Sequence, residues 1–466
     1  MIGTMTLTSL AKQLDGQLLG VDASFAKLST DTRSLGPGEA YLALVGDRFD
    51  GNDFVEQAQK SGAAAAIVSR ETHCEIPQLK VADTHKALAE IARENRLRSE
   101  AKIIALTGSQ GKTTVKEMLA AILSCAAPTL YTQANLNNTI GVPLTLLRLD
   151  NTHRFAVLEM GANAAGEIAF SVAAALPHIA LITNASDAHV EGFGSLAGIV
   201  SAKGEILDAL GSEGVAILNA DDPSVNEWVT RADSSHIVLF GFDNEDGRAS
   251  YYGKQIQQAE NGRVAFTLHS PLGSVEIKLQ MLGKHNIVNA VAAAAAAIEA
   301  GASLEQVQQG LSSVMPVKGR LSPLSGACNS RLIDDSYNAS PSSFRAAIDV
   351  LMSCKGKKVL LAGDMKELGP DESAAHADVG RYAREAGVDE LLAVGDLSKR
   401  TVEAFGAEGR HFNNQEALIA ACHGMANEHV TFLVKGSRGA RMDQVVSALS
   451  EENVQSAQAA PGNKGE

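Results

Sequence analysis

The chain of 466 residues has few cysteines and no closely spaced pair of them. No C-x-x-C pair occurs, and the number of cysteines is odd: Cys74, Cys125, Cys328, Cys354 and Cys422. Neither a disulfide framework nor a zinc site of the usual spacing is therefore indicated. A reducing compartment fits this pattern, and we expect the protein to be cytoplasmic.

Positive charge is also scarce, because 54 acidic residues against 40 basic ones give a formal net charge of −14. The basic residues form no stripe along the chain. This distribution argues against nucleic acid or an anionic membrane as the main partner. A polyanionic ligand would have to be bound by local positive sites instead.

Long apolar segments are absent as well. The longest apolar run, Ala290 to Ile298, is too short and too rich in alanine to span a bilayer. The first residues, MIGTMTLTSLAKQL, contain neither the basic segment nor the apolar segment of a signal peptide. We therefore expect no leader and no membrane insertion.

The segment from Ile103 to Leu123, IIALTGSQGKTTVKEMLAAIL, has the pattern of a strand, a small-residue turn and a helix. Such a turn can close backbone N–H groups on phosphate oxygens at the positive end of the helix dipole, while Lys112 adds a charge and Thr113 a hydroxyl for Mg²⁺. Leu106 stands where the longer P-loop pattern has a glycine. A turn that only connects two elements is the alternative, but it leaves Lys112 unexplained. The predicted nucleotide site comprises Thr107, Gly108, Ser109, Gln110, Gly111, Lys112, Thr113 and Thr114.

Length and pattern together predict an α/β protein of about three domains. Strand and helix patterns alternate on both sides of a break at VMPVKGRL, while period-two strands between Gly247 and Leu282 indicate antiparallel hairpins. We find no internal repeat of solenoid or propeller period. The predicted order is a small mixed α/β N-terminal domain (1–82), a central P-loop ATPase-like domain with a parallel sheet and an antiparallel addition (83–315), a C-terminal Rossmann-like doubly wound domain (316–454) and a disordered tail (455–466).

Acidic and basic side chains follow the strands next to the predicted phosphate loop. Glu159 ends the apolar strand RFAVLEMG, where a carboxylate commonly holds Mg²⁺, although a solvated strand-end glutamate is the alternative. His189 follows a neighbouring strand at the same end, and either a structural histidine or a metal or phosphate contact fits that position. Lys203 lies in the helical segment SAKGEIL and would ordinarily be a solvated charge.

Two polar segments are candidates for ligand contacts. The cluster STDTRSLGPGEAYLAL, from Ser29 to Leu44, can hydrogen-bond a nucleobase or hold a diphosphate through Arg33, and turn chemistry explains it equally well. The segment TQANLNNTIGVP begins at Thr132 and brings Asn135, Asn137, Asn138 and Thr139 together. A ligand-facing loop or a turn fits this second segment.

The C-terminal part places its polar residues after strands, where doubly wound sheets bind ligands. They are Asp334, Asp335, Tyr337 and Asn338; Asp364, Lys366 and Glu367; and Lys435, Ser437 and Arg438. Before the domain break, Asn286 and Asn289 lie one helical turn apart and can share a ligand-facing side, with capping as the alternative. On the break itself, Arg320 can reach a transferring phosphoryl group. These positions predict a reaction in the cleft between two α/β domains, which suits a ligase because closure protects an acyl phosphate from water.

Ten motifs spread in order over nearly the whole chain resemble those of the Mur ligase family. They are TGSQGKTT, NNTIGVP, LEMGANAAGEIA, TNASDAHVEGFGS, SAKGEI, GKHNIVNA, KGRL, DDSYNASPSS, GDMKELG and KGSRGARM. The resemblance implies a bacterial cytoplasmic enzyme of peptidoglycan precursor synthesis that uses ATP and Mg²⁺, the latter at two sites, and works as a monomer. Because GDMKELG stands where the ligase for the third peptide residue carries Asp-Asn-Pro-Arg, it implies the step that joins D-alanyl-D-alanine to UDP-N-acetylmuramoyl-tripeptide through an acyl phosphate.

The resemblance also implies residue roles. Lys112 matches the phosphate lysine, while Thr113, Glu159 and His189 match Mg²⁺ ligands, and Lys203 matches a lysine that the family carries as a metal-binding carbamate. Asn289 is implied in adenine binding, Arg320 in phosphate binding and Asp335 in an ATP-side contact. The implied catalytic residues are Lys112, His189, Lys203, Arg320 and Asp335. The implied substrate residues are Ser29, Thr30, Asp31 and Arg33 at the uridine-diphosphate end, and Asn138, Thr139, Asn338, Lys435 and Ser437 nearer the reacting groups.

Two other functions stay open from the sequence alone. A different carboxylate-amine ligase of the same superfamily, such as a folylpolyglutamate synthetase, would share the phosphate loop and the domain order. A nucleotide-dependent switch that forms no bond would be expected to carry a guanine-reading N-K-x-D motif, which the sequence does not contain.

Overall fold

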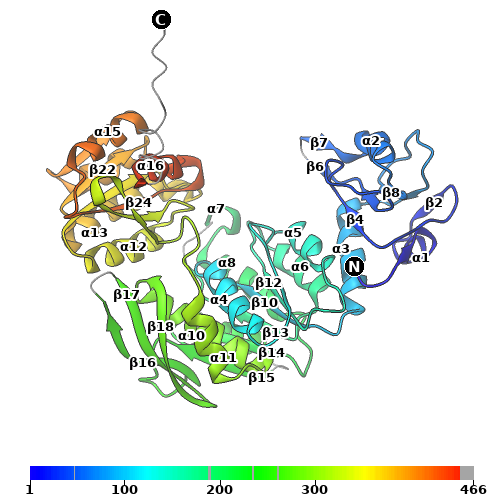
Figure 1. The fold of residues 1–466 in the computed structure, drawn as a ribbon, viewed down its shortest axis with the longest axis horizontal. Coiled ribbons are helices and arrows are strands. Elements are labelled where there is room, and N and C mark those ends of the chain that lie inside the picture. The colour runs from blue at the N-terminus through cyan, green and yellow to red at the C-terminus, as the bar shows by residue number, and fades with distance from the viewer. Residues whose placement is uncertain (47, 187–189, 233–235, 260–261, 452–466) are drawn as a thin grey trace, which may run out of the picture.

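The computed structural model describes residues 1–46, 48–186, 190–232, 236–259 and 262–451, which form three successive lobes (Figure 1). The N-terminal lobe and the C-terminal lobe stand on either side of the central lobe (Figure 1). The expected α/β class with three parts is confirmed. The exact domain boundaries stay a prediction, and the expected tail, 455–466, lies outside the described residues.

The N-terminal lobe is built on a five-stranded sheet of order β2-β9-β8-β5-β4. Its strands are β2 (Gln17–Leu19), β9 (Gln78–Lys80), β8 (Ala65–Val68), β5 (Ala40–Leu42) and β4 (Leu28–Ser29), and only the β2/β9 pair is antiparallel. Its smaller elements are β1 (Met5–Thr6), α1 (Leu7–Gln13), β3 (Ser24–Phe25), β6 (Val45–Gly46), β7 (Phe49–Asp50), η1 (Gly51–Phe54) and α2 (Val55–Lys60). The Asp83 carboxylate caps α3 (Thr84–Leu97), which leads into the central lobe.

The central lobe contains a nine-stranded sheet of order β11-β12-β10-β13-β14-β15-β16-β17-β18. The strands are β10 (Lys102–Thr107), β11 (Thr129–Tyr131), β12 (Phe155–Glu159), β13 (Ile179–Ile182), β14 (Val215–Asn219), β15 (His236–Gly241), β16 (Tyr251–Gln258), β17 (Arg263–Ser270) and β18 (Gly273–Leu282). Strands β11 to β16 pair in parallel, and the β16/β17 and β17/β18 pairs are antiparallel, as the change to period-two sequence predicts.

Helices cover both sides of this sheet, because its parallel strands are buried on both faces. They are α4 (Lys112–Ser124), α5 (Gly141–Leu146), α6 (Glu167–Ala175), α7 (Val190–Phe193), α8 (Leu196–Gly204), η2 (Glu205–Leu207), α9 (Val225–Arg231), α10 (His285–Ala300) and α11 (Leu304–Ser313). The alanine-rich α10 packs closely against α4 and shares one core with it. Small side chains permit this approach, which places the start of α10 beside the phosphate loop.

The C-terminal lobe contains a six-stranded sheet of order β19-β20-β24-β21-β22-β23. Its elements are β19 (Ser322–Ser325), η3 (Ala327–Asn329), β20 (Arg331–Asp335), α12 (Pro341–Ser353), β21 (Lys357–Gly363), η4 (Gly369–Asp371), α13 (Glu372–Ala386), β22 (Glu390–Val394), α14 (Ser398–Phe405), β23 (Gly409–Phe412), α15 (Gln415–Met425), β24 (Val430–Lys435), η5 (Arg438–Ala440) and α16 (Met442–Leu449). Apart from the antiparallel β19/β20 pair the strands run parallel, so the ends of β20, β21 and β24 lie at one edge. As the sequence predicts, Ser340 caps α12 and Pro341 is its first residue.

Central and C-terminal lobes are in direct contact. Leu282, at the end of β18, belongs to the same apolar cluster as Phe344 and Val350 of α12. A Cβ on Gly283 would press against the Val350 side chain, which shows how closely the two lobes approach at this point. No helix in the described part of the chain combines the length and the apolarity needed to cross a bilayer.

Candidate active site

A cleft of about 670 Å³ lies between the central lobe and the C-terminal lobe. Its central side is lined by the phosphate loop, the asparagine-rich loop, Glu159 and the start of α10. Its other side is lined by the 316–321 connection and by the loops that follow β20, β21 and β24. These are the ends of parallel strands at which ligand binding is expected.

The phosphate loop joins β10 to α4 at the floor of this cleft, and Ser109, Gln110, Gly111, Lys112 and Thr114 line it. Gly111 has a positive φ of 79°, and a Cβ there would clash with Oδ1 of Asn289. A side chain at this position is therefore excluded both by the backbone conformation and by the closeness of α10. Thr107 and Gly108 lie outside the lining, and the Thr107 hydroxyl donates to the Met160 carbonyl at 2.7 Å.

Lys112 folds back over its own loop, and its Nζ donates to the carbonyls of Gly108 (2.6 Å) and Ser109 (3.2 Å). Burial lowers the pKa of Lys112 to about 8, the charge of Arg320 adds to the lowering, and the Glu159 carboxylate opposes it. Carbonyl contacts are weak substitutes for phosphate oxygens, which would form charge-assisted hydrogen bonds with this ammonium group. A bound phosphate chain would therefore replace these two carbonyls as the hydrogen-bond partner of Lys112.

Glu159 is almost fully buried at the end of β12, beside the start of α4. Its Oε1 accepts hydrogen bonds from the Thr113 hydroxyl (3.1 Å) and from the Asn137 amide (2.8 Å). Its Oε2 is buried and has no hydrogen-bond partner within the described structure. An unpaired buried carboxylate oxygen is costly, and a bound cation is one way to satisfy it. A carboxylate and an adjacent hydroxyl form the kind of sparse oxygen site that Mg²⁺ uses together with phosphates and water.

Lys203 is buried in α8, outside the cleft lining, with its Nζ 5.3 Å from the centre of the Phe193 ring. Burial lowers the pKa of Lys203 to about 7, the charge of Lys112 acts in the same direction, and Glu205 and Glu167 oppose it. The solvated position that the sequence ordinarily suggests is therefore not what the structure shows. The other predicted metal ligand of this region, His189, lies outside the described residues.

Arg320 lines the cleft from the connection between the lobes, with its guanidinium 4.5 Å from the centre of the Tyr337 ring. The connection is held by the C-terminal lobe, because Asp334 accepts from Gly319 N (3.0 Å) and Asp335 accepts from Leu321 N (3.1 Å). Arg438 lies near the same ring, at 5.9 Å. Arg320 is near enough to the phosphate loop for its charge to contribute to the lowered pKa of Lys112.

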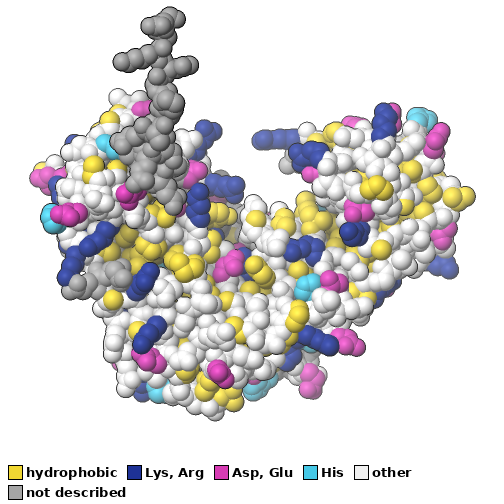
Figure 2. Space-filling view, in the orientation of Figure 1, with side chains coloured by type: hydrophobic (Ala, Val, Ile, Leu, Met, Phe, Trp, Pro, Cys, Tyr) yellow, Lys and Arg dark blue, Asp and Glu magenta, His cyan; other side chains and the backbone are white. Residues whose placement is uncertain are grey.

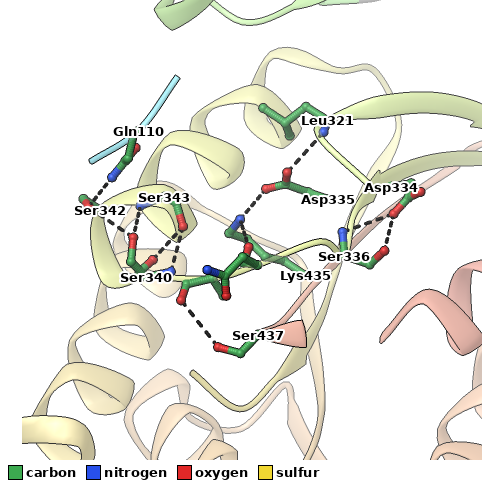
Figure 3. Close-up of polar contacts among 12 residues, drawn as sticks. Gln110, Leu321, Asp334, Asp335, Ser336, Ser340, Ser342, Ser343, Lys435 and Ser437 are labelled. Atoms are coloured by element: carbon green, nitrogen blue, oxygen red, sulfur yellow. Dashed lines mark hydrogen bonds and ion pairs between the residues drawn. The ribbon is translucent and has the colours of Figure 1, made fainter. Parts of the chain in front are cut away.

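Asp335 and Lys435 form a buried ion pair at the ends of β20 and β24. Lys435 also donates to the Asn338 carbonyl at 3.1 Å (Figure 3). Burial raises the pKa of Asp335, and Lys435 opposes this rise. Both residues and Asn338 line the cleft, whereas Ser437 lies behind the lining, where its hydroxyl accepts from Lys366 N at 2.9 Å.

The remaining predicted residues fall into two groups. Asn138 and Asn289 line the cleft, and Asn289 donates to Asn286 at 2.9 Å. Thr139 is outside the lining, and its carbonyl contacts the His85 ring at 3.1 Å.

The N-terminal cluster of Ser29, Thr30, Asp31 and Arg33 lies in another lobe, away from the cleft. Arg33 pairs with Asp31, which lowers the pKa of that carboxyl to about 2, and Ser29 bonds the Asp31 backbone. Figure 2 shows a hollow between the two outer lobes, with Lys and Arg side chains on both of its sides. The ligand-binding role of this cluster stays a prediction.

Three contributors were missed by sequence reasoning. Thr183 donates to the Gln110 carbonyl at 2.6 Å, His285 lines the cleft at the start of α10, and Ser342 accepts from the Gln110 side chain. Burial, with help from Lys435, lowers the pKa of His285 to about 4. The position of Thr183 directly after a strand next to β10 is the pattern that points to it, whereas the other two depend on how the lobes meet.

Comparison with known proteins gives matches along most of the chain. Three family models match: "Mur ligase family, catalytic domain" at residues 25–97, "Mur ligase middle domain" at 106–297 and "Mur ligase, glutamate ligase domain" at 319–438. The UDP-N-acetylmuramoyl-tripeptide:D-alanyl-D-alanine ligase of Escherichia coli is 45% identical over 450 residues, which cover 96% of this chain and 99% of the relative.

Solved structures agree with this. A crystal structure of MurF from Acinetobacter baumannii superposes with a TM-score of 0.90 at 38% identity and covers 96% of this chain and 98% of that chain. A MurF ligase structure from Thermotoga maritima in complex with ADP has a TM-score of 0.83 at 25% identity and covers 92% of this chain and 98% of that chain. The similarity therefore extends through all three lobes.

Proposed function

The chain belongs to the Mur ligase family, and we propose that it joins D-alanyl-D-alanine to UDP-N-acetylmuramoyl-tripeptide. It is an ATP-dependent peptide ligase of peptidoglycan precursor synthesis. The observation that carries the proposal is the single cleft in which the phosphate loop and Glu159 face Arg320 and the Asp335–Lys435 pair. A reaction that cleaves a phosphoanhydride and forms an amide needs both sides of such a cleft.

The ATP phosphates are assigned to the loop from Ser109 to Thr114. Its backbone N–H groups lie at the N-terminus of α4, where the helix dipole favours negative charge. Lys112 would exchange its carbonyl contacts for phosphate oxygens. Asn289, which lines the cleft next to Gly111, is assigned to the adenine, and Asp335 is assigned to the ATP-side contact of the C-terminal lobe; their positions in the cleft lining support both assignments.

Thr113 and Glu159 would hold Mg²⁺, since they provide a hydroxyl and an unpaired buried carboxylate oxygen at one point. The bound ion supplies neutralisation of phosphate charge. The proposal also includes a carbamate on Lys203, and the lowered pKa of this lysine supports it. A lysine with a pKa of about 7 is about half unprotonated at pH 7 and mostly unprotonated above it, and only the unprotonated amine reacts with carbon dioxide. His189 is assigned to the second Mg²⁺ on family resemblance alone.

The proposed reaction takes place in the cleft in two displacement steps. The terminal carboxylate of the tripeptide attacks the γ-phosphorus, ADP leaves, and an acyl phosphate forms. Lys112 and Arg320 stabilise the charge that spreads over the phosphoryl oxygens. The amine of D-alanyl-D-alanine then attacks the acyl carbon, loses a proton, and expels phosphate from a tetrahedral intermediate.

The lobes divide the recognition of the substrates. Asn138 and Asn338 line the cleft near the phosphate loop, and Lys435 and Ser437 organise the loop that follows β24. Ser29, Thr30, Asp31 and Arg33 of the N-terminal lobe are assigned to the uridine-diphosphate end, which would extend across the hollow between the outer lobes (Figure 2). Thr139 is assigned to substrate binding near the reacting groups, together with its neighbour Asn138.

One assay tests the proposed function. The protein is mixed with ATP, UDP-N-acetylmuramoyl-tripeptide and D-alanyl-D-alanine, and the product is weighed by mass spectrometry. We expect a product heavier than the tripeptide substrate by D-alanyl-D-alanine minus water, with one ADP per product. ATP hydrolysis that proceeds with folate and glutamate, and is indifferent to D-alanyl-D-alanine, would replace this function with that of a folylpolyglutamate synthetase.

A further inference from the structure

Gln110 bonds the phosphate loop directly to the C-terminal lobe. Its main chain is held within the central lobe, because Gln110 N donates to Asn184 Oδ1 (2.9 Å) and its carbonyl accepts from the Thr183 hydroxyl (2.6 Å). The base of the side chain is therefore fixed. The amide at the tip of the side chain extends from this fixed base toward the C-terminal lobe.

The Gln110 amide reaches the C-terminal lobe. Its Nε2 donates to the hydroxyl of Ser342 at 2.5 Å, between residues 232 positions apart (Figure 3). The same Nε2 also donates to the hydroxyl of Ser186 at 3.3 Å. Ser342 is the second residue of α12. One amide thus joins the phosphate loop, the loop that follows β13 and the first turn of a C-terminal helix.

The first turn of α12 is itself rigid. Ser340 and Ser343 form a reciprocal capping box, with Ser343 N donating to the Ser340 hydroxyl (3.3 Å) and Ser340 N donating to the Ser343 hydroxyl (2.8 Å) (Figure 3). The segment before this cap carries Asn338, whose carbonyl is bonded by Lys435. A displacement of Ser342 therefore displaces the cleft-lining residues between β20 and α12 as well.

Helix α12 contacts the central lobe both through apolar side chains and through a hydrogen bond. Toward its C-terminal end, Val350 packs against Leu282 and Gly283 through apolar contacts, which have no preferred direction. At its N-terminal end the Gln110–Ser342 hydrogen bond has a required distance and angle. Phe344, near the N-terminal end, belongs to the same apolar cluster, so the Gln110–Ser342 hydrogen bond adds a directional contact to an interface that is otherwise apolar along the helix.

We propose that the Gln110–Ser342 hydrogen bond is a latch that sets the angle of α12 above the phosphate loop. Gln110 is a positioning residue: it brings Asp335, Asn338 and Lys435 into register with a phosphate chain held by the backbone of its own loop. The inference rests on the proposed ligase function for its kinetic readout, but not for its structural readout.

A double-mutant cycle tests the latch. Gln110→Ala and Ser342→Ala are each expected to lower kcat by about 3- to 10-fold, the range of one net hydrogen bond, while the KM for ATP changes less than 2-fold. The double variant is expected to be no slower than the slower single variant, because both changes remove the same bond. Gln110→Asn, one methylene shorter, should behave like Gln110→Ala, and Ser342→Thr, which keeps the hydroxyl, should retain most of the rate.

Ser353→Ala is the matched control on the same helix, because that hydroxyl donates to the Val350 carbonyl of α12 itself. Hydrogen exchange supplies a readout without turnover: with a non-hydrolysable ATP analogue bound, peptide 336–343 should exchange faster in Gln110→Ala than in the unchanged protein and in Ser353→Ala.

The latch would be overturned by any of three results. The losses of kcat in the two single variants could multiply in the double variant, the KM for ATP could rise by as much as kcat falls, or the hydrogen exchange of peptide 336–343 could stay unchanged. A protein that makes no ligation product at all would instead refute the proposed function, and the exchange measurement would still decide the inference.

Discussion

Replacing Glu159 by Gln separates the stability of the empty protein from its response to Mg²⁺ and nucleotide. The amide keeps one oxygen to accept from Thr113 and Asn137, as Oε1 does now. It removes the negative charge and puts an amide NH2 group in place of the unpaired oxygen Oε2, so one unpaired polar group replaces another. Without metal we therefore expect the free energy of unfolding to stay within about 1 kcal/mol of the original, since no existing hydrogen bond is lost.

The response to ligand should change far more. At 100 times its dissociation constant, a bound Mg²⁺–nucleotide complex stabilises the unaltered protein by about 2.7 kcal/mol, or about 5–10 °C in Tm for a lobe of this size. Removing an outer-shell partner already costs 10- to 100-fold in metal affinity, so losing the ligand itself should cost at least about 100-fold. At the same ligand concentration the variant would then gain only about 0.4 kcal/mol, or about 1 °C.

The assay is thermal unfolding with and without Mg²⁺ and a non-hydrolysable ATP analogue. Glu117→Gln is the matched control, since Glu117 lies on α4 away from the cleft and pairs with Lys116. We expect the control to keep the full shift. A full ligand-induced shift in Glu159→Gln, or a Tm in metal-free buffer lowered by as much as the ligand raises it, would refute the reasoning.

Four further changes test other parts of the site. Lys112→Ala should abolish ligation and leave the circular dichroism spectrum and Tm nearly unchanged, and near-normal turnover would remove its assignment. Lys203→Ala should be nearly inactive and partly rescued by short-chain carboxylic acids, which replace a carbamate, and absence of rescue would argue against carbamylation. Gly111→Ala should destabilise the protein by at least about 1–2 kcal/mol in denaturant titrations and weaken nucleotide binding, because its Cβ meets Asn289 at a positive φ; unchanged binding would contradict this. Arg33→Ala should raise the KM for the UDP substrate about tenfold with an unchanged KM for ATP, and equal changes in both would contradict the N-terminal assignment.

The sequence predicted a structural feature correctly where all the residues of that feature lie in one continuous segment. The strand-turn-helix of the phosphate loop, the strand end at Glu159 and the Ser340-Pro341 start of α12 appear in the structure as the pattern predicts. The antiparallel pairing of β16 with β17 and of β17 with β18 was also readable, because apolar runs give way to period-two alternation after Gly247.

Contacts between segments far apart in the chain were not accessible in this way. Nothing in the sequence places Ser342 beside Gln110, since their contact depends on the packing of α12 against the end of β18. The burial of Lys203 was likewise hidden, because a lysine in a helical segment is usually solvated. The motif resemblance, not the local pattern, singled out this residue.

The central claim is that the cleft first converts the tripeptide carboxylate into an acyl phosphate and then forms the amide. The direct measurement uses UDP-N-acetylmuramoyl-tripeptide with ¹⁸O in its terminal carboxylate, together with ATP and D-alanyl-D-alanine, and determines the isotope content of the released phosphate. One ¹⁸O atom in each phosphate is the predicted result, because the attacking oxygen leaves with phosphorus. Released phosphate that contains no ¹⁸O, alongside normal amide product, would contradict the account.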